Sequence, residues 1–119
     1  MYSSEYEIES VVRGFATCET DKSAFKHRDH LTVAVWYLQD SKTALDRMRA
    51  GLLRFIEHHG VPPEKYSETV TVYWIDLIAE KLAELPAGAS LVTQCNYVIS
   101  QIARKPASRA EDEASPVTS

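Results

Sequence analysis

The sequence has 119 residues, of which 45% are hydrophobic and 25% are charged, the balance of an ordinary globular domain. A net charge of −4 argues against a general nucleic-acid-binding protein, and no apolar run approaches the roughly 20 residues that a membrane span needs. No signal peptide is visible in the first residues, and two cysteines are too few for a disulfide framework, so we expect a cytoplasmic protein.

The chain opens with two predicted helices. Apolar residues recur at helical spacing over 5–15, and Ser3 or Ser4 is placed to cap this helix. A polar loop over 16–26 follows, and a second helical pattern runs over about 28–38. Both helices are therefore short, with a loop of about ten residues between them.

A third helix over 43–59 has the clearest pattern, with Ser41 as the expected N-cap. Six residues share its apolar face: Leu45, Met48, Leu52, Phe55, Ile56 and His59. Gly60 stands where a helix-ending glycine belongs, and the two prolines after it prevent the helix from continuing.

A fourth helix begins at Pro63 or Tyr66 and ends near Leu85. Its expected apolar face comprises Val70, Tyr73, Trp74, Leu77, Ile78, Leu82 and Leu85. The β-branched and aromatic run over 70–75 also suits a strand, but the helical spacing persists and no second strand is present for pairing. A fifth helical pattern runs over 91–102, with Ser90 as its cap.

The residues from 106 to 119 are polar and contain one apolar residue larger than alanine, so they predict a disordered tail. Residues 1–105 then form the domain, an all-α antiparallel bundle of four to five helices. Within it, Cys95 is expected to be a small buried apolar residue, whereas the polar loop around Cys18 favours an exposed thiol.

The four histidines occur as two pairs. His27 and His30 share one helical face if the second helix begins after Lys26. Imidazoles at this spacing are a usual way to present two nitrogen ligands to a transition metal such as zinc, copper or nickel. If Asp29 is instead the N-cap, His27 lies outside the helix.

The second histidine pair ends the third helix, whose apolar face selects His59 and leaves His58 exposed. Glu68 follows after a short turn, so an antiparallel arrangement would bring His59 and Glu68 together with His27 and His30 at one bundle end. This set predicts a metal site formed by these four residues. It also predicts general acid–base catalysis by His30, His59 and Glu68, because histidine titrates near neutrality.

Each histidine also has a structural explanation. The helix dipole favours a histidine at the end of the third helix, His30 suits a core edge, and His27 suits an exposed loop. The spacing H-x-x-H alone is a weak motif, and the sequence contains neither HExxH nor the Glu-x-x-His pairs of di-iron bundles.

Hydroxyl and aromatic side chains near these positions predict a small-ligand pocket with a polar end. Its expected ligand-binding residues are Tyr37, Thr69, Thr71 and Trp74. The aromatic residues at helical spacing fit a hydrophobic core equally well.

Three motifs together resemble a family of small uncharacterised bacterial all-helical proteins. They are F-x-H-x-x-H-L from Phe25, H-H-G from His58 and Y-x-E-T-x-T-x-x-W from Tyr66, and the resemblance covers about residues 20–103. It implies that the histidines, Glu68 and the threonines recur as a set, but it implies no activity. Relatives often carry histidine where this chain has Ser67, which implies that one ligand is missing here.

Two hypotheses of function remain open. One is a polar histidine and glutamate site that binds a small molecule or a transition metal, with acid–base catalysis as its enzymatic form. The other is a non-enzymatic interaction module, such as a homodimer, in which the histidines are structural. Neither hypothesis involves nucleic acid or a membrane.

Overall fold

The computed structural model describes residues 1–103, which form five α-helices and no strand. The α-helices are α1 (Glu5–Ala16), α2 (His27–Tyr37), α3 (Ala44–His58), α4 (Glu68–Ala83) and α5 (Leu91–Val98). A 3₁₀ turn, η1 (Pro63–Lys65), precedes α4, and a π-helical turn, η2 (Ile99–Ala103), extends α5. The predicted all-α class is confirmed, and the predicted tail over 106–119 lies outside the described residues. Across those same 103 positions, no helix has the length and apolar character that crossing a membrane requires.

Serine caps begin three of the helices. The hydroxyl of Ser4 accepts from the amide of Glu7, and the Glu7 carboxylate accepts from the amide of Ser4. Ser67 and Ser90 cap α4 and α5 in the same way, through the amides three residues on. These hydroxyls satisfy amide groups that a helix start otherwise leaves without partners. The predicted caps at Ser4 and Ser90 are confirmed.

Two predicted helix starts are wrong. The N-cap of α3 is Thr43 rather than Ser41, because the chain makes one more turn after Asp40. The helix α4 begins only at Glu68, since η1 occupies the residues after the prolines. The expected end of α3 is correct: Gly60 has a φ of +72°, which costs glycine little.

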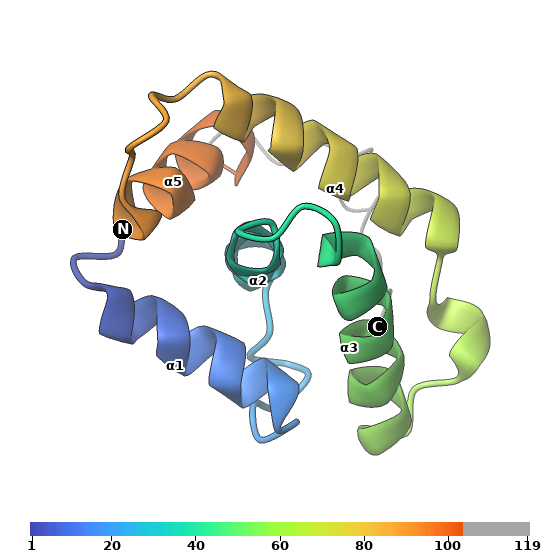
Figure 1. The fold of residues 1–119 in the computed structure, drawn as a ribbon. Coiled ribbons are helices and arrows are strands. Elements are labelled where there is room, and N and C mark those ends of the chain that lie inside the picture. Colours follow the sequence, from blue (N-terminus) through green and yellow to red (C-terminus); the bar gives the residue numbers. More distant parts are fainter. Residues whose placement is uncertain (104–119) are drawn as a thin grey trace.

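The helix α2 lies at the centre of the domain, where Figure 1 shows it end-on with the other helices around it. Five consecutive residues of α2, Leu31 to Val35, are buried, so this helix has no solvent-facing side in its middle. A helix that is buried all round is mainly apolar, and the polar residue of this stretch, Thr32, donates its hydroxyl to the carbonyl of Arg28. This arrangement places the start of α2, with its histidines, against several neighbouring helices.

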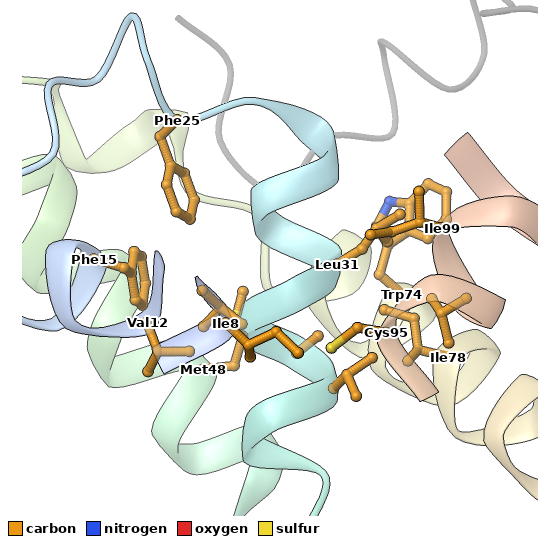
Figure 2. Close-up of a cluster of buried hydrophobic side chains, with 14 of the residues drawn as sticks. Ile8, Val12, Phe15, Phe25, Leu31, Met48, Trp74, Ile78, Cys95 and Ile99 are labelled. Atoms are coloured by element: carbon orange, nitrogen blue, oxygen red, sulfur yellow. The ribbon is translucent and has the colours of Figure 1, made fainter. Parts of the chain in front are cut away.

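The core contains all three phenylalanines in mutual contact. The ring centroid of Phe15 lies 5.0 Å from that of Phe25 and 5.4 Å from that of Phe55. Figure 2 shows Phe15 and Phe25 on one side of α2, with Trp74 on the other. Gly51 makes room for this cluster, because a Cβ atom there would stand 2.6 Å from the Phe15 ring.

The two cysteines are both buried. Cys95 is inaccessible to solvent, as predicted, and burial raises the pKa of its thiol to about 12. The prediction of an exposed Cys18 is wrong. Its backbone takes a φ of +62°, which turns the side chain inward toward the carbonyl of Arg54.

The apolar face expected for α4 is also partly wrong. Tyr73, expected to be buried, is 56% exposed, while Thr71 is almost fully buried. The buried residues of α4 are Thr71, Trp74, Ile75 and Ile78. The face is therefore rotated from the expected one, and it points toward α2 and α3.

Tyr2 fastens the start of the chain to α2 and α5. Its backbone exchanges two hydrogen bonds of 2.9 Å with the side chain of Asn96. Its hydroxyl lies 2.8 Å from the Thr32 oxygen, and the Thr32 hydroxyl donates to the carbonyl of Arg28. The tyrosine is therefore the donor in this buried pair.

We predict that Tyr2→Phe lowers the free energy of unfolding by about 1 kcal/mol, the usual net worth of one buried hydrogen bond. Urea unfolding at pH 7 measures the change. Tyr6→Phe is the matched control, because the side chain of Tyr6 is exposed on α1. An equal effect of the two substitutions would contradict the assignment.

Candidate functional site

The local structure at the start of α2 determines where His27 and His30 lie. Lys26 is the N-cap, and the Asp29 carboxylate accepts a 2.9 Å hydrogen bond from its amide. The helix therefore begins at His27, and the alternative with Asp29 as N-cap is wrong. With both histidines inside the helix, their spacing places them on the same face.

That face borders a cavity between α2, α3 and α4. The cavity is lined by His27, His30, Leu31, Ala34, Met48, Thr71, Trp74, Ile75 and Ile78. With its opening to solvent it encloses about 300 Å³, although the centre of a water molecule can reach only about 20 Å³ of this space. Its walls are apolar. The reachable volume is little more than one water molecule needs, so the side chains around the cavity have to move before a larger molecule can enter.

His30 is the residue of the cavity wall whose surroundings change its protonation. Its Nδ1 atom is buried and has no hydrogen-bond partner within residues 1–103. The ring packs edge-on against Phe25, with centroids 4.5 Å apart. Burial and then the neighbouring His27 lower the pKa of His30 to about 4, against a weaker opposing effect of the Lys26 carbonyl. The imidazole is therefore neutral at pH 7.

Two of the four predicted ligand-binding residues line the cavity with the histidines. Trp74 packs edge-on against His27, with ring centroids 5.2 Å apart. Thr71 is buried beside it, and its hydroxyl donates to the carbonyl of Ser67 over 2.8 Å. The other two lie elsewhere, because Thr69 is exposed and Tyr37 is at the far end of α2.

His59 does not line the cavity. It caps the end of α3 and packs on Phe55, with ring centroids 4.4 Å apart. Its Nε2 is buried and has no hydrogen-bond partner in the described part of the chain. His58 beside it is exposed, as predicted. Both histidines therefore pack on the phenylalanine cluster, His30 on Phe25 and His59 on Phe55.

Glu68 is engaged by an arginine rather than by a histidine. Both carboxylate oxygens accept from Arg49, over 2.8 and 2.5 Å, and Glu68 also accepts from the Tyr66 hydroxyl over 2.7 Å. Arg49 and then Tyr66 lower the pKa of Glu68 to about 2. The expected meeting of Glu68 with the histidines is therefore wrong, because Arg49 on α3 is the nearer and stronger partner.

These positions bear on the metal hypothesis. Among the described residues, no group of three or more histidine, cysteine, aspartate or glutamate side chains is arranged to hold a metal ion. His27 and His30 are brought together, but His59 and Glu68 have other neighbours.

The ion pair predicts how Glu68 titrates. In a carbon NMR titration, the Glu68 carboxyl should show a midpoint near pH 2, and Arg49→Met should return it toward the ordinary glutamate range. Asp46→Asn is the control, because it removes the other carboxylate on Arg49 and keeps both bonds to Glu68. A midpoint that Arg49→Met leaves unchanged would refute this pairing.

The apolar half of the cavity was not expected as part of a site. Leu31, Ala34, Met48, Ile75 and Ile78 line it, and the sequence pattern indicates only that they are core residues. Ala34 was the available signal, because a small side chain in a helix of bulky ones leaves space beside its neighbours.

Comparison with protein-family models, with curated proteins and with solved structures found no match. The resemblance to small bacterial helical proteins stays a prediction, and the cavity has to be interpreted from its own residues.

Proposed function

We propose that this domain binds a small molecule in the cavity between α2, α3 and α4, with His30 as the principal polar contact. One observation carries the proposal: the cavity borders a neutral imidazole whose Nδ1 is buried without a partner in residues 1–103. Small-molecule sites in proteins typically combine apolar walls with a few polar groups in this way.

The energy of the unpartnered nitrogen supports the same proposal. Burying a polar atom without a hydrogen bond costs about 1–3 kcal/mol, and an apolar side chain at position 30 would avoid this cost. Residues that destabilise a fold are common at binding sites, where stability is lost in exchange for function. A ligand that pairs with His30 would recover the lost hydrogen bond.

The other hypotheses have less support. Acid–base catalysis by a histidine and Glu68 lacks its carboxylate, because Arg49 engages Glu68. An interaction module would need a continuous apolar surface. The large exposed apolar side chains of residues 1–103 are instead divided among the chain start and three helices: Met1, Tyr6, Leu53 and Tyr73.

A thermal-shift screen with small neutral compounds tests the proposal. The variant Ala34→Leu is designed to block the cavity, because Ala34 lines it and is buried. Ala50→Leu is the matched control, since Ala50 is exposed on α3. We expect at least one compound to stabilise the unmodified protein and Ala50→Leu but not Ala34→Leu. If no compound binds, or if Ala34→Leu responds equally, the proposal is wrong.

A further inference from the structure

We infer that the ligand of this cavity is an uncharged, mainly apolar molecule of a few heavy atoms that carries one hydroxyl group, which hydrogen-bonds to His30. This inference rests on the proposed function and adds the chemical class of the ligand. It follows from three properties of the site: its walls, its polar groups and its size.

The walls exclude a charged ligand. No lysine, arginine, aspartate or glutamate occurs among the described residues that line the cavity. The ion pair between α3 and α4 joins Arg49 to Glu68, so each of these two charges already has a partner. A charged group that entered would lose its hydration and meet no counter-charge, which is strongly unfavourable in an apolar site.

The polar groups of the cavity favour a hydroxyl group. A neutral imidazole offers one donor and one acceptor nitrogen, and burial keeps His30 neutral by lowering its pKa. The Thr71 hydroxyl is already engaged, because it donates to the Ser67 carbonyl and interacts with the Tyr66 side chain. A ligand hydroxyl both donates and accepts, so it can pair with the His30 imidazole whichever nitrogen carries the proton.

The size of the cavity restricts the rest of the molecule. The centre of a water molecule can reach about 20 Å³ of the cavity, little more than one water molecule needs, so a small ring or a short chain enters only if the surrounding side chains move apart. Because the walls are apolar and Nδ1 is buried, the His30 ring has to turn toward the cavity to reach the ligand. Side-chain rotations of this kind are common on binding.

Phenol and toluene are matched probes for this inference, because they differ only in a hydroxyl against a methyl group. Their dissociation constants are measured by NMR titration for the unmodified protein and for His30→Leu, which keeps an apolar side chain of similar size. Toluene reports whether the cavity still binds an apolar ring. The ratio of the two dissociation constants therefore measures the contribution of the hydroxyl group to binding. We expect His30→Leu to weaken phenol relative to toluene about fivefold, the value of one net hydrogen bond.

Two further variants control for indirect effects. His58→Leu removes an exposed histidine and should leave the ratio unchanged. His30→Asn keeps a hydrogen-bonding group near the position of Nδ1, and it should restore part of the preference for phenol. If His30→Leu does not fold, the ratio in His30→Asn is compared with that in the unmodified protein, and it should show a weaker preference for phenol.

The outcomes separate this inference from the proposed function. If neither probe binds the unmodified protein, the proposed function fails with it. If both bind and His30→Leu leaves their ratio unchanged, the cavity binds small molecules but the assignment of a hydroxyl to His30 is overturned. Benzoate, which is anionic at pH 7, should bind more weakly than phenol, and tighter binding would overturn the uncharged class.

Discussion

Replacing Phe15 by alanine should lower the free energy of unfolding by about 3–5 kcal/mol, the usual cost of removing a buried phenylalanine. Phe15 is inaccessible to solvent and contacts both Phe25 and Phe55. The backbone of α3 approaches its ring at Gly51, so the surrounding residues cannot easily collapse into the space. The two other rings carry His30 and His59, so this loss should also loosen the site.

Urea unfolding at pH 7 measures the effect of Phe15→Ala. Tyr6→Ala is the control, since Tyr6 lies on the same helix with 69% of its surface exposed, and it should change stability by less than about 0.5 kcal/mol. A loss below about 1 kcal/mol in Phe15→Ala would mean that the phenylalanine cluster does not hold α1, α2 and α3 together.

The second large effect is the contribution of His30 to the dependence of stability on pH. Its pKa is about 4 in the folded protein and 6.5 in the unfolded chain, so the unfolded chain binds more protons between these values. Stability contributed by the neutral imidazole is therefore complete above about pH 6.5 and is lost as the pH falls toward 4. The expected loss between pH 7 and pH 4 is about 3 kcal/mol.

Urea unfolding of the unmodified protein and of His30→Leu at several pH values isolates this effect. Carboxylates also titrate over part of this range, but they are common to both proteins and cancel in the difference. The difference should grow in favour of His30→Leu by about 3 kcal/mol from pH 7 to pH 4. His58→Leu, which leaves His30 in place, should retain the acid-induced loss. A difference that stays constant with pH would show that His30 is not held neutral by burial.

Much of the fold follows from local sequence signals. Helical spacing predicts each of the helices, and Ser4, Gly60 and Ser90 act at the positions that their side chains or backbone freedom favour. These features depend on residues close in sequence, so the sequence alone contains the relevant physical information. The arrangement around α2 depends on all the other helices, and its buried middle could not be derived from one helix at a time.

The errors also share a physical cause. The burial of Thr71 in place of Tyr73 and of Cys18 in a polar loop results from tertiary packing, which overrides local hydrophobicity. A threonine can be buried at this position because its hydroxyl is satisfied by the Ser67 carbonyl one turn earlier. Spacing alone gives no sign of either outcome.

The candidate site was predicted only in part, because its geometry also depends on tertiary packing. The spacing of His27 and His30 predicts that they share a face, and this pair does border the cavity with Thr71 and Trp74. The separation of Glu68 from them depends on its ion pair with Arg49, which the sequence pattern does not predict. Which residue pairs with Glu68 depends on the distance between their side chains. Distances between helices cannot be derived from spacing along the chain.

The central claim is that His30 in the cavity wall is neutral and forms a hydrogen bond to the ligand. Nitrogen NMR of the His30 imidazole tests this claim most directly. Spectra of selectively labelled protein resolve the two ring nitrogens and report which carries the proton. We expect one protonated and one bare nitrogen that persist well below pH 6, and a shift of both on addition of phenol. A ring that becomes doubly protonated near pH 6.5, or that does not respond to phenol at saturation, would contradict the claim.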